Sequence, residues 1–165
     1  MKRICRLSDW INRCVQYIGF VQLSLMTLII ILQVFYRYVL GSSLSWSEES
    51  ARFLFIWVVL LGASMGVKES FHVSVTLFKD MLPRRIKVTV DVLVNLLTGV
   101  VAAIMVVYGL SIAETVSIQL SPAVRISMFW VYLAIPVSGA LMLLHLTARM
   151  VELAQTFSAV DKGDC

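Results

Sequence analysis

Histidines and cysteines are the side chains of this 165-residue sequence that we consider first as ligands of a metal or a cofactor. Two buried imidazoles that face each other can bind a haem iron, and His72 and His145 are expected at similar depth. Cys5, Cys14 and Cys165 lack metal-ligand spacing, and there is no CxxC pair. The sequence predicts no enzyme, no metal site and no cofactor. Haem or quinone binding by a membrane redox subunit stays as the alternative.

A charged turn stands directly before the second long apolar run. Its members and neighbours are Arg37, Trp46, Glu48, Glu49, Arg52 and Trp57. Glu48 and Arg52 are four residues apart and can pair along a helix. At a membrane boundary such a pair needs further partners, and Arg37 is a candidate for Glu49. Two interpretations stay open: a clamp that fixes the first two spans, or an acidic and aromatic platform for a partner subunit.

The polar side chains within the apolar runs include Gln22, Gln33, Asp91 and Asn95. Gln22 and Gln33 are eleven residues apart, about three helical turns, and so share a face. Such groups are expected to bond between helices, because lipid offers them no partner; a ligand contact is the other interpretation. Asp91 lies within a turn of the basic Lys87. No charge falls near the middle of a span, so the chain is not expected to hold a transport path alone.

Composition determines the elements that position these residues. Hydrophobic residues make up 59% of the sequence, charged residues only 15%, and the mean hydropathy is +0.88. Soluble domains carry about a quarter charged residues, so the excess apolar surface must face lipid. The net charge of +4 comes from residues between the apolar runs and does not indicate nucleic acid binding.

The apolar runs predict an all-α membrane protein with four transmembrane helices. They cover about residues 15–36, 49–67, 88–113 and 126–148. Residues 1–152 are expected to form one domain. The uncharged core of the second span, 53–67, covers only about 22 Å, so the charged turn before it must lie at the interface of a core about 30 Å thick. Gly62 and Gly66 form a GxxxG motif that permits close approach of a helix. Pro136 is expected to kink the fourth span.

The connections between spans carry their own predictions. Residues 1–13 have amphipathic spacing and predict a short interfacial helix, with a disordered basic tail as the alternative. Residues 45–48 have capping-box spacing and start a helix. The connection 68–87 fits an alternating strand or an interfacial helix. We favour the helix, because a lone strand would leave its edges unpaired. The polar segment 153–165 is expected to be a disordered cytoplasmic tail.

The basic residues predict the orientation in the membrane. Eleven of the fourteen Lys and Arg lie near the N-terminus, in the 68–87 connection, or at the C-terminal end. The positive-inside rule places these three regions, and therefore both termini, on the cytoplasmic side of a bacterial inner membrane. Residues 37–49 and 114–125 then face the outside.

Several of these residues follow one another at spacings typical of a known family. The pattern W-x-E-E-x-x-R occupies residues 46–52, Arg37-Tyr38 precedes it, and Leu61-Gly62-Ala63 and His72 follow it. Ser121-Pro122-Ala123 and the segment 130–136 continue the match. The sequence resembles the small, DctQ-type membrane subunit of tripartite ATP-independent periplasmic (TRAP) transporters over about residues 15–145.

The resemblance implies a four-span, non-catalytic scaffold subunit embedded in membrane lipid. It implies a separate large membrane subunit with the sodium and substrate sites. It also implies a periplasmic substrate-binding protein that delivers an organic acid such as a C4-dicarboxylate or sialic acid. Many relatives have the pattern H-x-x-V-D after the histidine, whereas Val75-Thr76 stand here. A carboxylate role is therefore not carried over to that place. A third hypothesis, a small oligomeric exporter, would need a carboxylate at mid-membrane, which the sequence lacks.

Overall fold

The chain folds into long helices that run back and forth. The computed structural model describes residues 2–42, 44–79 and 84–161, and the side chains of 6, 8–42, 44–68, 92–148 and 150. Within these ranges the helices are α1 (Lys2–Val39), α2 (Ser45–Lys79), α3 (Arg84–Thr115), α4 (Met128–Tyr132) and α5 (Ala134–Asp161). Four segments are long and apolar enough to cross a membrane: Ser8–Val39, Ser45–Lys68, Val92–Thr115 and Met128–Ala148. The predicted all-α class with four spans is confirmed.

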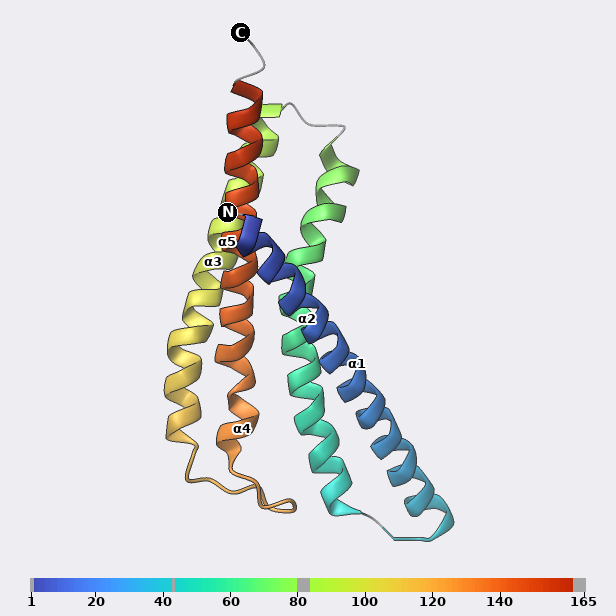
Figure 1. Cartoon of the computed structure of the whole chain (residues 1–165). Coiled ribbons are helices and arrows are strands. Elements are labelled where there is room, and N and C mark those ends of the chain that lie inside the picture. Colours follow the sequence, from blue (N-terminus) through green and yellow to red (C-terminus); the bar gives the residue numbers. More distant parts are fainter. Residues whose placement is uncertain (1, 43, 80–83, 162–165) are drawn as a thin grey trace.

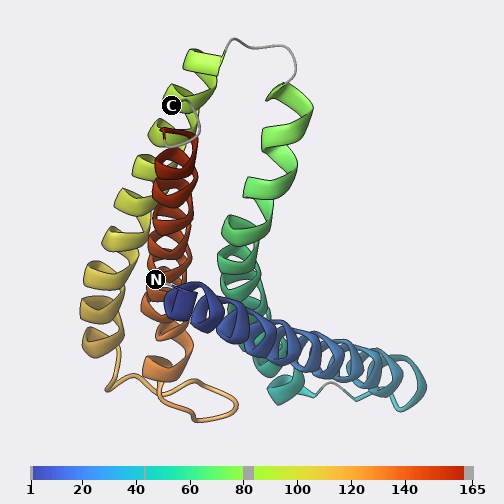
Figure 2. The same ribbon diagram turned by 45° about the horizontal axis from the view of Figure 1, so that its top comes forward.

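The long helices form two pairs, α3 with α5 and α1 with α2 (Figure 1). Helices α3 and α5 run side by side, and α2 lies along α5. Helix α1 begins near α5, then runs away from it and packs mainly against α2 (Figure 2). Residues 40–42 and 116–127 lie at one end of the molecule, which we call the loop end.

Small residues allow α3 and α5 to approach each other closely. A Cβ atom placed on Gly139 would lie 2.9 Å from the backbone oxygen of Ala102. One placed on Gly109 would lie 2.8 Å from Ile135 Cγ2 and 3.1 Å from the backbone nitrogen of Pro136. These distances leave no room for a side chain, so the two glycines are what permits this contact, as in many membrane helix pairs.

The GxxxG motif of the second span does not make such a contact within this chain. A Cβ atom on Gly62 or Gly66 would meet nothing within 4 Å. The close approach expected at this motif is instead found at Gly109 and Gly139, which lack that spacing in sequence.

The N-terminal segment is helical, but it is not a separate element. Helix α1 runs without a break from Lys2 into the first span, and it contains no proline and a single glycine, Gly19. Ser8 and Asn12 are buried against neighbouring helices. The predicted amphipathic helix over 1–13 is thus the first part of α1, because the sequence provides no residue that ends a helix there.

Helix α2 begins at Ser45, where the sequence predicts a helix start, and continues to Lys79. A helix over the beginning of the 68–87 connection is confirmed, although it continues the second span and is not a separate interfacial helix, and the strand alternative for 71–77 is wrong. No glycine or proline occurs between Val67 and Lys79, so the helix of the second span continues unchanged.

The fourth span is divided into α4 and α5 at Leu133. The Ser127 hydroxyl caps α4 by accepting the backbone N–H of Phe129 at 3.3 Å. Pro136 stands in the first turn of α5, where its missing N–H is tolerated. The interruption therefore falls three residues before the proline. At the other end α5 reaches Asp161, so most of the segment expected to be a disordered tail is helical.

Candidate functional site at the loop end

The outer part of the charged turn is an exposed ion pair. Arg52 Nη2 donates to Glu48 Oε1 at 3.0 Å along one face of α2. Both side chains are about two-thirds exposed. An exposed pair of this kind contributes about 0.5 kcal/mol or less. The pair therefore does not hold the fold together, and both groups remain accessible to other molecules.

Glu49 forms the inner part of the turn and makes a long-range contact. Its Oε2 atom accepts the backbone N–H groups of Ala123 at 2.9 Å and Val124 at 2.8 Å. Arg37, the partner considered from the sequence, is instead exposed near the end of α1. Hydrogen bonds to a charged acceptor are stronger than neutral ones. The carboxylate thus clamps the start of α2 to the second loop of this end, rather than to the first span.

The second loop presents those two N–H groups because it is fixed on itself. Ser121 is buried, and its backbone N–H donates to the oxygen of Ile126 at 2.9 Å. Arg125 closes the turn with φ of +57°, in the left-handed region, and its N–H donates to the oxygen of Ser121 at 3.2 Å. Successive N–H groups in such a turn make a concavity for an anion. Here the anion is the Glu49 carboxylate.

The two tryptophans of the cluster differ in exposure: Trp57 is half-buried, whereas Trp46 is exposed. Trp57 Nε1 donates to the backbone oxygen of Trp130 at 3.2 Å and so joins α2 to α4. Trp46 is 43% exposed. Glu49 and Trp57 therefore join α2 to the second loop and to α4, and not to the first span, so these two side chains do not form the predicted clamp of the first two spans. The partner-platform interpretation is left to the outward residues Trp46, Glu48, Arg52 and Arg37, and it stays a prediction.

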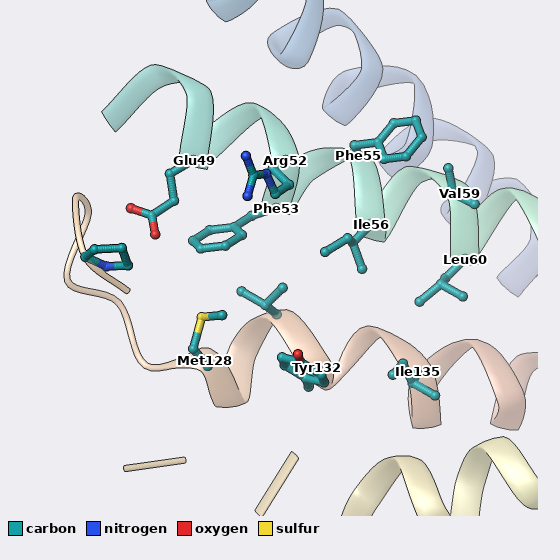
Figure 3. Close-up of a pocket in the computed structure, with 12 residues that line it drawn as sticks. Glu49, Arg52, Phe53, Phe55, Ile56, Val59, Leu60, Met128, Tyr132 and Ile135 are labelled. Atoms are coloured by element: carbon teal, nitrogen blue, oxygen red, sulfur yellow. The ribbon is translucent and has the colours of Figure 1, made fainter. Parts of the chain in front are cut away.

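A groove opens beside the clamp, between α2 on one wall and α4 and α5 on the other (Figure 3). Its volume is about 600 Å³. Its lining is formed by Glu49, Arg52, Phe53, Phe55, Ile56, Val59, Leu60, Pro122, Met128, Val131, Tyr132 and Ile135. Glu49 and Arg52 lie at the end nearest the loop, and the deeper walls are apolar.

Sequence reasoning missed a second polar cluster, at the opposite end of the spans. Ser8 Oγ lies 2.8 Å from His145 Nδ1, in a buried contact between α1 and α5. Lys68 Nζ donates to Asp9 Oδ1 at 2.6 Å and joins α2 to α1. The polar face of the N-terminal segment was visible in the sequence. However, residues so far apart in the chain carry no local signal of their pairing.

The four polar residues expected between helices show no completed bonds in the described part. Gln22 Oε1 and both amide atoms of Asn95 are buried without a hydrogen-bond partner. Gln33 is half-buried, and the Asp91 side chain lies outside the described residues. A buried amide without a partner costs about 1–3 kcal/mol. The interhelical role of these residues stays a prediction.

No redox or metal centre is assembled by the side chains that the structure describes. Among them, no three His, Cys, Asp or Glu side chains gather closely enough to hold a metal ion. His145 already contacts Ser8 through Nδ1, and the His72 side chain lies outside the described residues. The two-histidine haem hypothesis gains no support from the residues described.

Comparison with known proteins identifies a family for this arrangement. A model of the family described as "Tripartite ATP-independent periplasmic transporters, DctQ component" matches residues 26–156. The sialic acid TRAP transporter permease protein SiaT of Haemophilus influenzae is 30% identical over 143 residues, which are 87% of this chain and 22% of that protein. The small permease protein SiaQ of Vibrio cholerae is 27% identical over 131 residues, 79% of this chain and 76% of SiaQ.

A third relative is named for another substrate. The C4-dicarboxylate TRAP transporter small permease protein DctQ of Vibrio cholerae is 32% identical over 87 residues, 48% of this chain and 38% of that protein. This chain therefore matches less than two thirds of the length of SiaT and of this DctQ. All three relatives are permease proteins of transporters, not enzymes, as the sequence predicted.

Proposed function

This chain belongs to the DctQ component of the tripartite ATP-independent periplasmic transporters, and we propose that it holds a separate large membrane subunit in place during organic acid uptake. As a DctQ-type small permease subunit with four candidate spans, it is a multi-pass bacterial membrane protein. The large subunit, and not this chain, contains the solute path. This proposal rests on the absence of ionisable side chains from the centres of the spans.

That observation can be checked along the spans. The described segments 53–67 and 92–113 contain no Asp, Glu, Lys, Arg or His, and neither does 14–36 of α1. A carrier binds its polar solute near the membrane midplane with ionisable groups or unwound helices. The interruption at Leu133 lies in the half of the membrane nearer the loop end and exposes no charged group. A second chain must therefore provide the path.

The substrate class follows from the relatives. Their names refer to sialic acid and C4-dicarboxylates, which are both organic acids. We infer that the complex takes up such a carboxylate together with sodium ions and receives it from a periplasmic substrate-binding protein. With both termini in the cytoplasm, as the basic residues predict, the loop end faces that protein. Trp46 and Glu48 are exposed at this end and are available to contact it.

The test is co-purification from the native host. A tagged copy of this chain in mild detergent is expected to recover one large multi-span protein of the same transporter class in stoichiometric amount. A matched control is an unrelated four-span protein with the same tag, which should recover none. Recovery of this chain alone, monodisperse and stable, would contradict the proposal.

A further inference from the structure

The groove between α2 and α4–α5 has a chemistry that the scaffold function does not use. Its deep walls carry large apolar side chains from both sides, including Phe53, Leu60 and Ile135 (Figure 3). Its mouth carries Arg52, whose side chain is 67% exposed. An apolar slot with a cation at one end matches an amphiphile with a long chain and an anionic head.

The position of the groove in the spans fits one leaflet of a bilayer. From Arg52 to Leu60 the wall rises about 12 Å along α2, at 1.5 Å per residue. Half of a bilayer core is about 15 Å thick. Because α2 and α5 cross the membrane, a chain lying in the groove runs parallel to the neighbouring lipid chains. Arg52 then lies near the level of the phosphates.

The charges at the mouth favour a phosphate there. The Glu49 carboxylate is already engaged by the two loop N–H groups, which partly neutralise it. Arg52 uses one of its nitrogens for Glu48. A guanidinium has five N–H donors and binds phosphate in a forked geometry, so it can keep Glu48 and still bind a phosphate oxygen.

The lining argues against a helix of a partner protein as the occupant. Membrane helices pack closely through Gly, Ala, Ser and Thr, and none of the twelve lining residues is of those types. Large side chains would hold a second backbone away, whereas a thin flexible chain fits between them. The open small-residue face of Gly62 and Gly66 on the same helix is the better seat for a partner helix.

We propose that this groove is a binding site for one glycerophospholipid, with an acyl chain between α2 and α5 and the phosphate on Arg52. The site lies within this chain and does not depend on the transport function proposed above.

The first test measures lipid retention by native mass spectrometry of the purified full chain, reconstituted with phosphatidylglycerol of defined chains. One lipid is expected to remain bound. Arg52→Gln removes a charge-assisted contact and should lower its affinity about tenfold. Arg52→Lys should retain part of it. Arg37→Gln, an exposed arginine at the same end but outside the groove, should retain it fully.

The apolar part of the site is tested with its own matched pair of variants. Val59 lines the groove and is 48% exposed, and Val100 on α3 is 50% exposed and lies outside it. Val59→Trp should fill the slot and remove the bound lipid, whereas Val100→Trp should leave it. Because both valines are half exposed, neither change is expected to prevent folding.

Three results would overturn the proposal. One is equal loss of lipid in the Val59 and Val100 variants, which would mean general surface coverage. Another is equal retention of diacylglycerol with the same chains, which has no phosphate. The third is that a photo-reactive group at position 59 joins mainly to a partner polypeptide in native membranes, because a helix then occupies the groove.

Discussion

The fourth span and α1 are built from similarly apolar sequence, yet they are packed in opposite ways. Of the most apolar window in the fourth span, 44% of residues are buried within the chain, whereas only 6% of the corresponding window of α1 are buried. Helix α5 packs on α3 through glycines that leave no space for a side chain. Helix α1 leaves large side chains such as Tyr17, Phe20 and Leu28 exposed along its length.

The difference shows which contacts the chain makes by itself. The α3–α5 pair buries its small-residue face and needs no other protein at that seam. Helix α1 is attached at its N-terminal end by Ser8 and Asp9, and beyond that it relies on α2, lipid or a further subunit. Mutations can therefore separate contacts that stabilise the chain from surfaces that serve the complex.

The largest effect is expected in the α3–α5 seam. Gly139→Leu places a side chain against the backbone of Ala102 and should lower the stability of the detergent-solubilised chain by about 3 kcal/mol or prevent its folding. Gly62→Leu is the matched control, because nothing lies within 4 Å of a Cβ there. Thermal unfolding of both variants checks this, and equal loss in the two would break the comparison.

Next in size is the clamp at the loop end. Glu49→Ala leaves the N–H groups of Ala123 and Val124 without their acceptor, and we expect a loss of about 2 kcal/mol. Faster hydrogen exchange at these two amides should accompany it. Glu48→Ala breaks only an exposed pair and should cost about 0.5 kcal/mol or less. If the neighbouring carboxylates prove equivalent, Glu49 is not a clamp.

A smaller effect is expected where α1 meets α5. Ser8→Ala removes the buried contact to His145 and should cost about 1 kcal/mol. Ser24→Ala removes an exposed hydroxyl that bonds only the backbone of its own helix, so it should be nearly neutral. Thermal unfolding separates them. A Ser24 variant as unstable as the Ser8 variant would mean that α1 is sensitive to serine loss in general.

The smallest effect is expected for the ion pair between α1 and α2. Asp9 is largely exposed and Lys68 is not, so a double-mutant cycle with Asp9→Asn and Lys68→Met should give a coupling of about 0.5 kcal/mol. The coupling should fall in high salt. If this coupling exceeded the stability lost in the Ser8→Ala variant, the ion pair would be the stronger of the two attachments of α1.

The sequence predicts the parts of this fold that depend on local physics. Long uncharged runs determine the four spans, and the absence of helix-breaking residues explains why α2 continues past Val67. Pro136 indicates an interruption of the fourth span. Because its missing N–H would bond the oxygen of Tyr132, the break at Leu133 lies in the turn before the proline.

The sequence could predict which residues belong to the candidate site, but not which groups they contact. The pattern at 46–52 marks Glu49, but its partners are backbone N–H groups, which have no residue type to recognise. The choice of Gly109 and Gly139 over Gly62 and Gly66 depends on which helix faces come together, and spacing alone does not encode that. The Ser8–His145 contact joins positions 137 residues apart for the same reason.

The central claim is that this chain supports a transporter without forming its path. The direct measurement is uptake of radiolabelled sialic acid or a C4-dicarboxylate into vesicles, driven by a sodium gradient and with the substrate-binding protein present. Vesicles with both membrane subunits should accumulate the substrate, and vesicles with this chain alone should match protein-free vesicles. Uptake by this chain alone would contradict the account.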